Sequence, residues 1–371
     1  MSSGTSRRSL LTALGAAAVG ISFGGLAGCS KPAASGGASS AAPEGNTLNF
    51  YNWDTYIGET TLADFKAASG IDVSMSLFAT NDELFAKMKT GNSGFDVIVP
   101  SNDFVTRLSQ AELLLPLDHA KLPNLANIDP AFLNPDYDPG RKWSVPYTWL
   151  VLGIGYRKSK MKDMGGSKIP DSWKWVFDSN LYKGKIALLS ESGDLVRLGA
   201  KYLGHSVNGI TPELVNQVKD MLIKQKPNVH AFHNDDGQDM LLSKEVDIVI
   251  EYNGDIAQVM TEDADLDFVI PKEGSQLNSD TWCIPKDSPR PDNAHKFINY
   301  MMDAKAGAEI YKTILYPTPN AAAKALMPDS YKNNPVIFPP AAALAKCEYA
   351  AFEGPEKAQL YEEAMTAVKA S

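Results

Sequence analysis

The sequence predicts an α/β fold with two lobes, each a mixed, mostly parallel sheet flanked by helices, and the lobes are joined by hinge strands. Residues 46–371 are too many for one average domain and suit two. Short apolar strands alternate with amphipathic helices in two successive sets, the pattern of sheets covered by helices. The sequence shows no internal repeat, so we expect two different α/β lobes.

The N-terminal residues predict export from the cytoplasm. Arg7 and Arg8 form a twin-arginine pair, and residues 10–28 carry no charge and are rich in alanine and glycine. The run ends in Leu26-Ala27-Gly28-Cys29, which is similar to a lipobox. We therefore expect a twin-arginine-type lipoprotein signal peptide at residues 1–28 and lipidation of Cys29. The alternative is a transmembrane helix, since the run approaches the ~20 residues that span a bilayer. Its five glycines argue against this.

A flexible tether is expected after the signal. Residues 29–45 are rich in alanine, serine and glycine and lack apolar periodicity, so they cannot bury a core. This arrangement predicts a body held by lipid at the outer face of a membrane, in the periplasm or its equivalent.

The first lobe is predicted from residues 46–148 together with 272–320. Residues 48–53, 71–78 and 95–100 have strand character, and helices are expected at 59–69 and 81–90. Gly70 is placed to end the first helix, and Asn81 to cap the second. Ser101 or Asn102 is expected to cap the helix that follows the third strand. A further helix is expected at 293–302.

The second lobe is predicted from residues 149–271 together with 321–371. Residues 185–189 and 246–251 read as strands, and residues 195–203 as a helix. Thr211 and Pro212 open another helix, as N-cap and first helical residue. Because ligands of open α/β sheets bind beyond the carboxyl ends of the strands, we expect the site between the two lobes.

The charge of the chain argues against one class of ligand. The formal net charge is −9 and the sequence has no basic stripe, so nucleic-acid binding is disfavoured.

The sequence does not decide the state of two cysteines. Outside the cytoplasm, Cys283 and Cys347 could form a disulfide or remain two buried thiols, and both states stay open.

Several loops after predicted strands combine an acid with aromatic residues but contain no arginine or lysine. An alkyl ammonium offers three hydrogen-bond donors and is best held by carboxylates. Aromatic faces supply a wall for methylene groups and a cation–π attraction of ~0.5–2 kcal/mol. Such loops suit a molecule with two or more amines, although aspartates after strands also serve as caps and turns. The loop residues that carry this pattern are Trp53, Asp54, Tyr56, Asp103, Glu191, Asp194, Tyr252, Asp255, Asp280 and Tyr316.

In the same regions the sequence resembles the spermidine/putrescine-binding proteins of ABC importers, from about residue 46 to the C-terminus. The resemblance rests on Tyr51-Asn52-Trp53-Asp54-Thr55-Tyr56, Phe95-Asp96-Val97-Ile98-Val99-Pro100-Ser101, Ser144-Val145-Pro146-Tyr147-Thr148-Trp149, Pro271-Lys272-Glu273-Gly274 and Tyr316-Pro317-Thr318-Pro319-Asn320. It implies a two-lobed periplasmic-binding-protein fold of the second topological type and a polyamine ligand. It also implies a membrane permease with its ATPase as partners. We expect a monomer that is not an enzyme and needs neither cofactor nor metal.

The resemblance also assigns residues to the ligand site. Trp53 and Tyr56 match an aromatic pair, with Asp54 and Thr55 between them, and Asp280 matches a central acid that holds an amine. Further matches are Ser101, Glu191, Asp194, Tyr252, Asp255 and Tyr316. The sequence departs from the family at Asn278, commonly tryptophan, and at Asp103, commonly tyrosine or a small residue. These departures leave open which polyamine or related amine is bound.

The sequence gives weaker indications of other functions. No nucleophile elbow, P-loop or spaced acid pair indicates an enzyme. His230 and His233, followed by Asp235 and Asp236, form a weak candidate for a metal site. An amino acid, an opine-like compound or ferric ion are alternative solutes. An amino acid would need Arg107, Arg141 or Arg197 to face the cleft.

Overall fold

The computed structural model describes residues 44–371. The expected signal peptide at residues 1–28, the lipidation site at Cys29 and the tether up to residue 43 lie outside the described residues. Among the helices that the structure describes, none combines the length and apolar character needed to cross a membrane.

The first lobe is built on a mixed sheet with strand order β2-β1-β3-β11-β4. Parallel pairing joins β1 to β2 and to β3, whereas β11 runs antiparallel to β3 and β4. The strands are β1 (Thr47–Asn52), β2 (Asp72–Leu77), β3 (Val97–Ile98), β4 (Ser144–Pro146) and β11 (Thr281–Cys283). The helices are α1 (Thr61–Ser69), α2 (Asn81–Lys89), α3 (Asn102–Gln110), α9 (Pro291–Met301), α10 (Ala304–Ile314), α11 (Ala321–Leu326) and α12 (Asp329–Lys332). Short 3-10 turns lie at η1 (His119–Lys121), η2 (Pro123–Asn127), η3 (Pro130–Phe132) and η4 (Pro139–Arg141).

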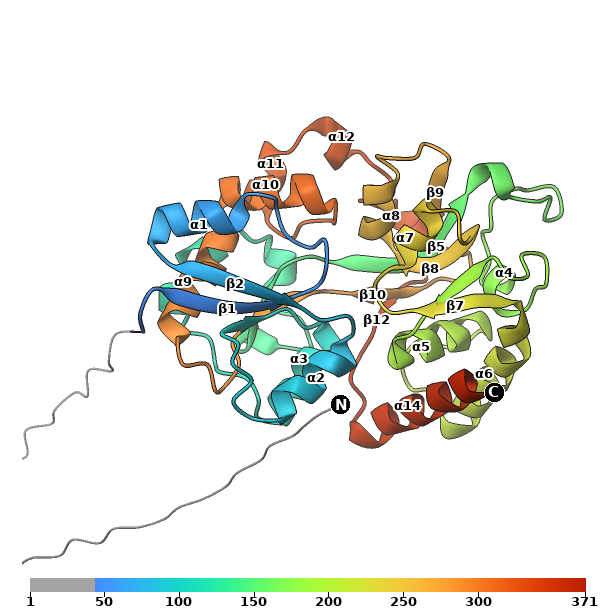
Figure 1. The fold of residues 1–371 in the computed structure, drawn as a ribbon, viewed down its shortest axis with the longest axis horizontal. Coiled ribbons are helices and arrows are strands. Elements are labelled where there is room, and N and C mark those ends of the chain that lie inside the picture. The colour runs from blue at the N-terminus through green and yellow to red at the C-terminus, as the bar shows by residue number, and fades with distance from the viewer. Residues whose placement is uncertain (1–43) are drawn as a thin grey trace, which may run out of the picture. The chain divides into compact units, whose positions relative to one another are not determined.

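The second lobe also contains a mixed sheet, ordered β12-β10-β5-β8-β6-β7, with β9 paired to β5 (Figure 1). Its strands are β5 (Leu150–Arg157), β6 (Ile186–Leu189), β7 (Val229–His233), β8 (Ile248–Tyr252), β9 (Leu266–Val269), β10 (Gln276–Asn278) and β12 (Glu348–Tyr349). Its helices are α4 (Lys174–Phe177), α5 (Ser192–Tyr202), α6 (Pro212–Gln225), α7 (Gly237–Leu242), α8 (Asn253–Val259), α13 (Ala341–Leu344) and α14 (Pro355–Ala370), with 3-10 turns η5 (Lys158–Lys160) and η6 (Lys226–Asn228). The C-terminal helix α14 lies beside α5 and α6.

The chain crosses between the lobes three times. The first crossing joins β4 to β5, the second joins β10 to β11, and the third follows α12 on the way to β12. The chain therefore returns to the first sheet after Asn278, later than the expected residue 272. Residues 321–337 also differ from the expectation, because Ala323, Tyr331 and Ile337 are buried in the core of the first lobe. Only the last helix of the C-terminal stretch, through Tyr361 and Met365, joins the core of the second lobe.

Local sequence signals explain several helix ends. Gly70 ends α1 in the left-handed conformation at φ 74°, as its position after the helix predicts. Thr211 caps α6 by accepting a hydrogen bond from the backbone N–H of Leu214, with Pro212 next. The expected cap Asn81 is wrong, because Thr80 caps α2 and accepts from the N–H of Glu83. The side chain of Asn81 is directed to Ser101 instead.

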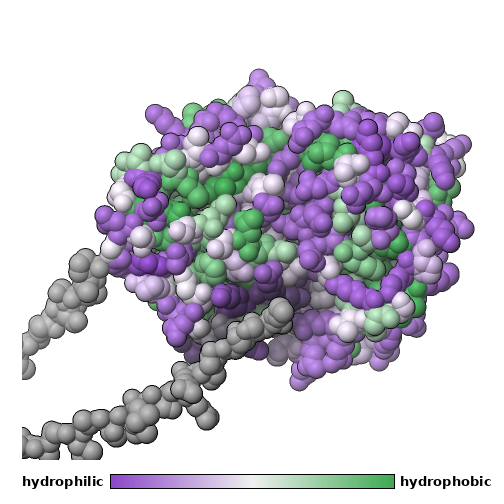
Figure 2. All heavy atoms as spheres, in the orientation of Figure 1, coloured by the Kyte–Doolittle hydropathy of each residue, from purple (hydrophilic) through white to green (hydrophobic). Residues whose placement is uncertain are grey.

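The face of the molecule in Figure 2 is largely hydrophilic. Apolar atoms gather over α1 and β2, and in β2 Met75 and Leu77 are exposed.

Both cysteines of the described residues are free thiols. Cys283 is buried in β11, and Cys347 is half-buried before β12. The disulfide that the sequence left open is therefore not formed.

Candidate functional site

A pocket of about 320 Å³ lies where the two lobes meet, and both lobes contribute side chains to it. Ser101 and Tyr56 come from loops that follow strands of the first sheet, and Asp280 lies on the crossing before β11. Asp235 and Asp255 follow strands β7 and β8 of the second sheet. The complete lining is Trp53, Asp54, Tyr56, Ser101, Leu150, Asp235, Tyr252, Asp255, Asp280 and Tyr316.

Asp280 is held in place by donors from the first lobe. The Ser101 hydroxyl donates to its Oδ1 at 2.7 Å, and the Tyr56 hydroxyl donates to its Oδ2 at 2.9 Å. Backbone pairing supports the geometry, since Ser101 and Asp280 form an isolated antiparallel bridge. Tyr56 also contacts the hydroxyl of Thr148. The carboxylate is 5% exposed and keeps a fixed direction into the pocket.

Asp255 occupies the second lobe's side of the pocket. It lies in the first turn of α8, and the Tyr316 hydroxyl donates to its Oδ2 at 2.6 Å. The ring of Tyr316 covers Gly254, where a Cβ atom would lie 2.2 Å from the tyrosine Cδ2. The absence of a side chain at position 254 therefore lets Tyr316 reach Asp255.

Aromatic rings form the walls between these acids. The rings of Tyr56 and Tyr316 meet edge to face, with centroids 4.8 Å apart. The indole N–H of Trp53 donates to the carbonyl of Val99 at 2.9 Å, which fixes the half-buried indole at the pocket. Together with Leu150, these rings offer an apolar surface to methylene groups.

Burial dominates the electrostatics of the carboxyl groups. It raises the pKa of Asp280 to about 6, although the hydrogen bonds from Ser101 and Tyr56 oppose the shift. Burial also raises the pKa of Asp255 to about 7, against the hydrogen bond from Tyr316 and with a contribution from the charge of Asp280. The pKa of Asp235 is raised well above its usual value by burial and by Asp255. Among the described residues, the lining includes several acids but no lysine or arginine. The pocket therefore favours a cation, whose charge would keep these groups ionised.

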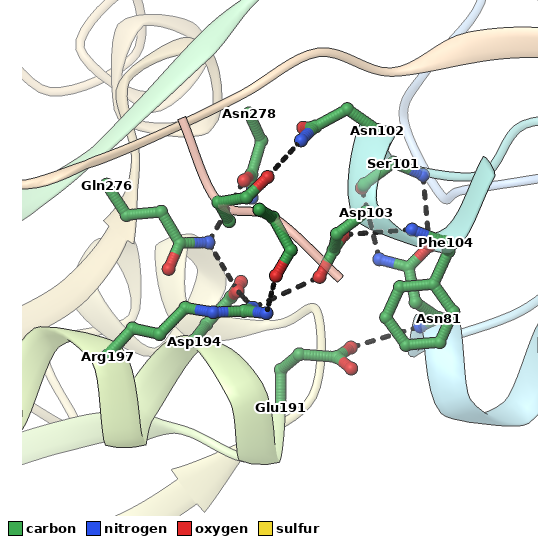
Figure 3. A network of polar contacts seen from close by, with 12 residues as sticks. Asn81, Ser101, Asn102, Asp103, Phe104, Glu191, Asp194, Arg197, Gln276 and Asn278 are labelled. Atoms are coloured by element: carbon green, nitrogen blue, oxygen red, sulfur yellow. Dashed lines mark hydrogen bonds and ion pairs between the residues drawn. The ribbon is translucent and has the colours of Figure 1, made fainter. Parts of the chain in front are cut away.

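Four predicted site residues lie in a neighbouring network instead of the pocket. Figure 3 shows them around Arg197 of α5, which reaches toward α3 of the first lobe. They are Asp103, Glu191, Asp194 and Asn278, and all four line a second cavity of about 500 Å³. Thr55 lines neither cavity; it is exposed, with a φ of 48°.

Arg197 pairs with two of these acids. Its Nη1 lies 3.1 Å from Asp103 Oδ2 and 3.7 Å from Asp194 Oδ1. The opposite oxygen of Asp194 accepts a 2.6 Å hydrogen bond from the hydroxyl of Tyr252, which lines the first pocket. Glu191 accepts from the backbone N–H of Asn81 at 3.0 Å, across the two lobes. Burial, followed by the charge of Asp82, raises the pKa of Glu191 well above its usual value.

Sequence reasoning missed Asp235 as a pocket residue. The sequence offers Asp235 only as a candidate metal ligand, yet it follows β7 in the same way that Asp255 follows β8. Its place after a strand of the second lobe was the signal that could have found it.

The metal and amino-acid alternatives find little support in the geometry. In the described part of the chain, no cluster of histidine, cysteine and acidic residues is arranged to hold a metal ion. His233 is buried, contacts the carbonyl of Ile250 through Nε2 at 3.0 Å, and has its pKa lowered to about 4 by burial. Arg107 pairs with Asp82 and Glu362, and Arg141 is buried near Phe132 and Ser144. These arginines and Arg197 are thus engaged by the protein itself.

Comparisons of the sequence with known proteins all indicate one family. Residues 60–339 match the family described as bacterial extracellular solute-binding protein. The chain is 33% identical to the spermidine/putrescine-binding periplasmic protein 1 of Haemophilus influenzae, over 90% of this chain and 92% of that protein. It is 32% identical to the putrescine-binding periplasmic protein PotF of Escherichia coli K12, over 88% of this chain and 92% of PotF.

Solved structures support the same assignment. A Listeria monocytogenes protein assigned to a spermidine/putrescine ABC transporter superimposes with a TM-score of 0.82 at 32% identity, covering 88% of this chain and 99% of the other. The two-lobed α/β fold predicted from the sequence is confirmed.

Proposed function

This chain belongs to the bacterial extracellular solute-binding proteins, in the spermidine/putrescine-binding family of ABC importers, and we propose that it captures a polyamine in the pocket between its lobes. The family consists of binding proteins that are not enzymes. The observation that carries the proposal is the excess of carboxylates in the pocket. Asp54, Asp235, Asp255 and Asp280 line it, and no basic side chain of the described residues does.

Each part of a polyamine has a counterpart in this pocket. One ammonium group would be held by Asp280, which the hydroxyls of Ser101 and Tyr56 already orient. A second would be held on the other side by Asp255 and Asp235. The methylene chain between them would lie against the rings of Tyr56 and Tyr316. Neutral or anionic solutes would leave these acids without a partner.

Capture is coupled to closure in this proposal. Asp54 and Ser101 belong to the first lobe, and Asp235 and Asp255 to the second. A ligand that contacts both sets binds the closed arrangement more tightly than the open one and so shifts the equilibrium between them. The membrane permease and its ATPase would recognise the closed form and receive the solute.

Membrane attachment by lipid belongs to the same proposal. A solute-binding protein of this family works outside the cytoplasm. The arginine pair and the lipobox-like end of residues 1–29 supply an export route and an acylation site at Cys29. A lipid anchor with a flexible tether would keep the protein close to its permease.

Calorimetric titration of Asp280→Asn with putrescine and spermidine tests the binding site. The substitution removes the charge but preserves the shape of the side chain. We expect the loss of about 2–5 kcal/mol of binding free energy, the range for removing one partner of a buried charge pair.

The control is Asp329→Asn, because Asp329 is an exposed aspartate of α12 with 85% of its side chain accessible. It should bind as the unaltered protein does. Unchanged polyamine affinity in Asp280→Asn would reject this pocket as the binding site. If the unaltered protein bound no polyamine at all, the proposed function itself would be rejected.

A further inference from the structure

The pocket for the polyamine is separated from the second cavity by polar side chains. In the described part of the chain, no residue lines both cavities. Hydrogen bonds link their linings, from Tyr252 to Asp194 and in both directions between Asn81 and Ser101. Gln276 donates to both Asp194 and Asn278 and completes the partition. A ligand longer than the first pocket would have to pass this network to reach the second cavity.

Arg197 lies at the centre of the partition (Figure 3). Its side chain is 5% exposed, and besides Asp103 and Asp194 it donates to the carbonyl of Ala351 at 3.0 Å. A guanidinium keeps its charge under all ordinary conditions. It offsets one of the two negative charges of Asp103 and Asp194. Protein donors also occupy both oxygens of each acid: the N–H of Phe104 and Arg197 at Asp103, and Gln276 and Tyr252 at Asp194. Neither carboxylate is therefore free to hold an ammonium.

Resting on the proposed function, we propose that Arg197 is a specificity-determining residue that restricts the pocket to linear diamines such as putrescine and cadaverine. Two ammonium groups find carboxylates at Asp280 and at the Asp235–Asp255 side. A third ammonium directed past Asp280 meets the guanidinium of Arg197 in place of a free acid.

The remaining acid of the pocket offers a longer amine little compensation. This acid is Asp54, which is exposed. An ion pair with an exposed carboxylate contributes little, because water and salt screen it. A triamine therefore loses burial or meets a like charge without gaining a third strong contact. We expect putrescine to bind at least about tenfold more tightly than spermidine, because like charges brought together at a binding site cost several kcal/mol.

Two substitutions in the network should change the preference for putrescine over spermidine in opposite directions. Calorimetric titration of each variant with both amines measures that preference. Arg197→Met removes the positive charge and frees Asp103 and Asp194, so spermidine should gain about tenfold relative to putrescine. Asp103→Asn removes one of the two acids that face Arg197 and so leaves less negative charge beside the guanidinium, and spermidine should lose further. Should Arg197→Met fail to fold, Asp103→Asn and the double variant Arg197→Met/Asp103→Asn, which leaves Asp194 free, give the same test.

The matched control is Arg290→Met. Arg290 also pairs with a buried acid, since its Nη2 lies 2.9 Å from Asp96 Oδ2, but neither residue lines the pocket or the second cavity. Its loss should change the affinity for both amines by the same factor and leave their ratio unchanged.

The outcomes separate this inference from the proposed function. Equal or tighter binding of spermidine by the unaltered protein would overturn the diamine limit, although it would still support a polyamine receptor. A ratio that does not move in Arg197→Met would overturn the role of Arg197. Failure of all amines to bind would overturn the proposed function itself.

Discussion

The two buried carboxyl groups of the pocket, Asp280 and Asp255, differ in how the protein holds them. Asp280 accepts two hydroxyl donors, from Ser101 and Tyr56, whereas Asp255 accepts one from Tyr316. Donors stabilise the ionised form, so the pKa of Asp280 is raised less, to about 6, than that of Asp255, to about 7. The two acids therefore become protonated at different pH values, and the negative charge of the pocket falls in two steps.

The affinity for a diamine should fall as the pH decreases through about 7 and then about 6, since the protons of these acids compete with the ligand. The sign follows from linkage: a raised pKa means that the free pocket takes up protons that binding must release. An alkyl ammonium resembles lysine and stays charged throughout. Below each pKa we expect about a tenfold loss for every pH unit. Calorimetry in two buffers of different ionisation enthalpy measures both the affinity and the protons released.

Asp255→Asn provides the internal control for this profile. The variant should bind more weakly at high pH and lack the step near pH 7, while the step near pH 6 from Asp280 persists. An affinity that stays flat from about pH 8 to about pH 5 would contradict the assignment of these acids to the amine site.

At the scale of elements, the loops after strands decide which side chains meet. The sequence placed Trp53, Tyr56 and Asp280 among the candidates because each lies at or near the end of a strand, and the structure brings them to one pocket. Glu191 and Asp194 fit the same pattern but lie in the neighbouring network. The difference arises because α5 begins at Ser192, before the expected residue 195, so its first turn carries Asp194 toward Arg197. The pairing of Arg197 with Asp103 joins residues that are far apart in the chain, so no local sequence pattern could have predicted it.

Replacing Gly254 with alanine should disturb the site through the start of α8. The new Cβ would lie 2.2 Å from Tyr316 Cδ2, so the ring must move away from Asp255. Overpacking of this kind typically costs about 1–3 kcal/mol of stability. We expect weaker polyamine binding together with a lower free energy of unfolding, measured by calorimetry and by urea denaturation.

A second helical glycine serves as the comparison. At Gly307 of α10 the added Cβ would approach Ala323 Cβ at 3.2 Å, a contact that small shifts can relieve. Gly307→Ala should therefore leave polyamine binding intact. Normal affinity in Gly254→Ala would show that Tyr316 does not need its present position to support the site.

At the scale of the whole described body, the sequence predicted two α/β lobes but not where the chain divides between them. The strand β10 is three residues long and pairs with β5 in the second sheet, so the Pro-Lys-Glu-Gly segment at 271–274 lies before the crossing and not within the first lobe. The sequence of residues 321–337 does not indicate which of the two hydrophobic cores its apolar side chains join. Their burial against the first lobe depends on contacts with α10, which only the folded chain defines.

Binding of a diamine should bring the lobes together in solution, because the pocket is complete only when acids from both lobes face it. Small-angle X-ray scattering should show a smaller radius of gyration with putrescine than without it. Arg107→Met removes the ion pairs from α3 to Asp82 and Glu362, of which the second crosses to α14 of the other lobe. This variant should be more extended than the unaltered protein when free and equally compact when saturated with ligand. Its apparent affinity falls by the fraction of closed form that is lost. A radius that putrescine leaves unchanged in both proteins would show that ligand capture does not depend on closure.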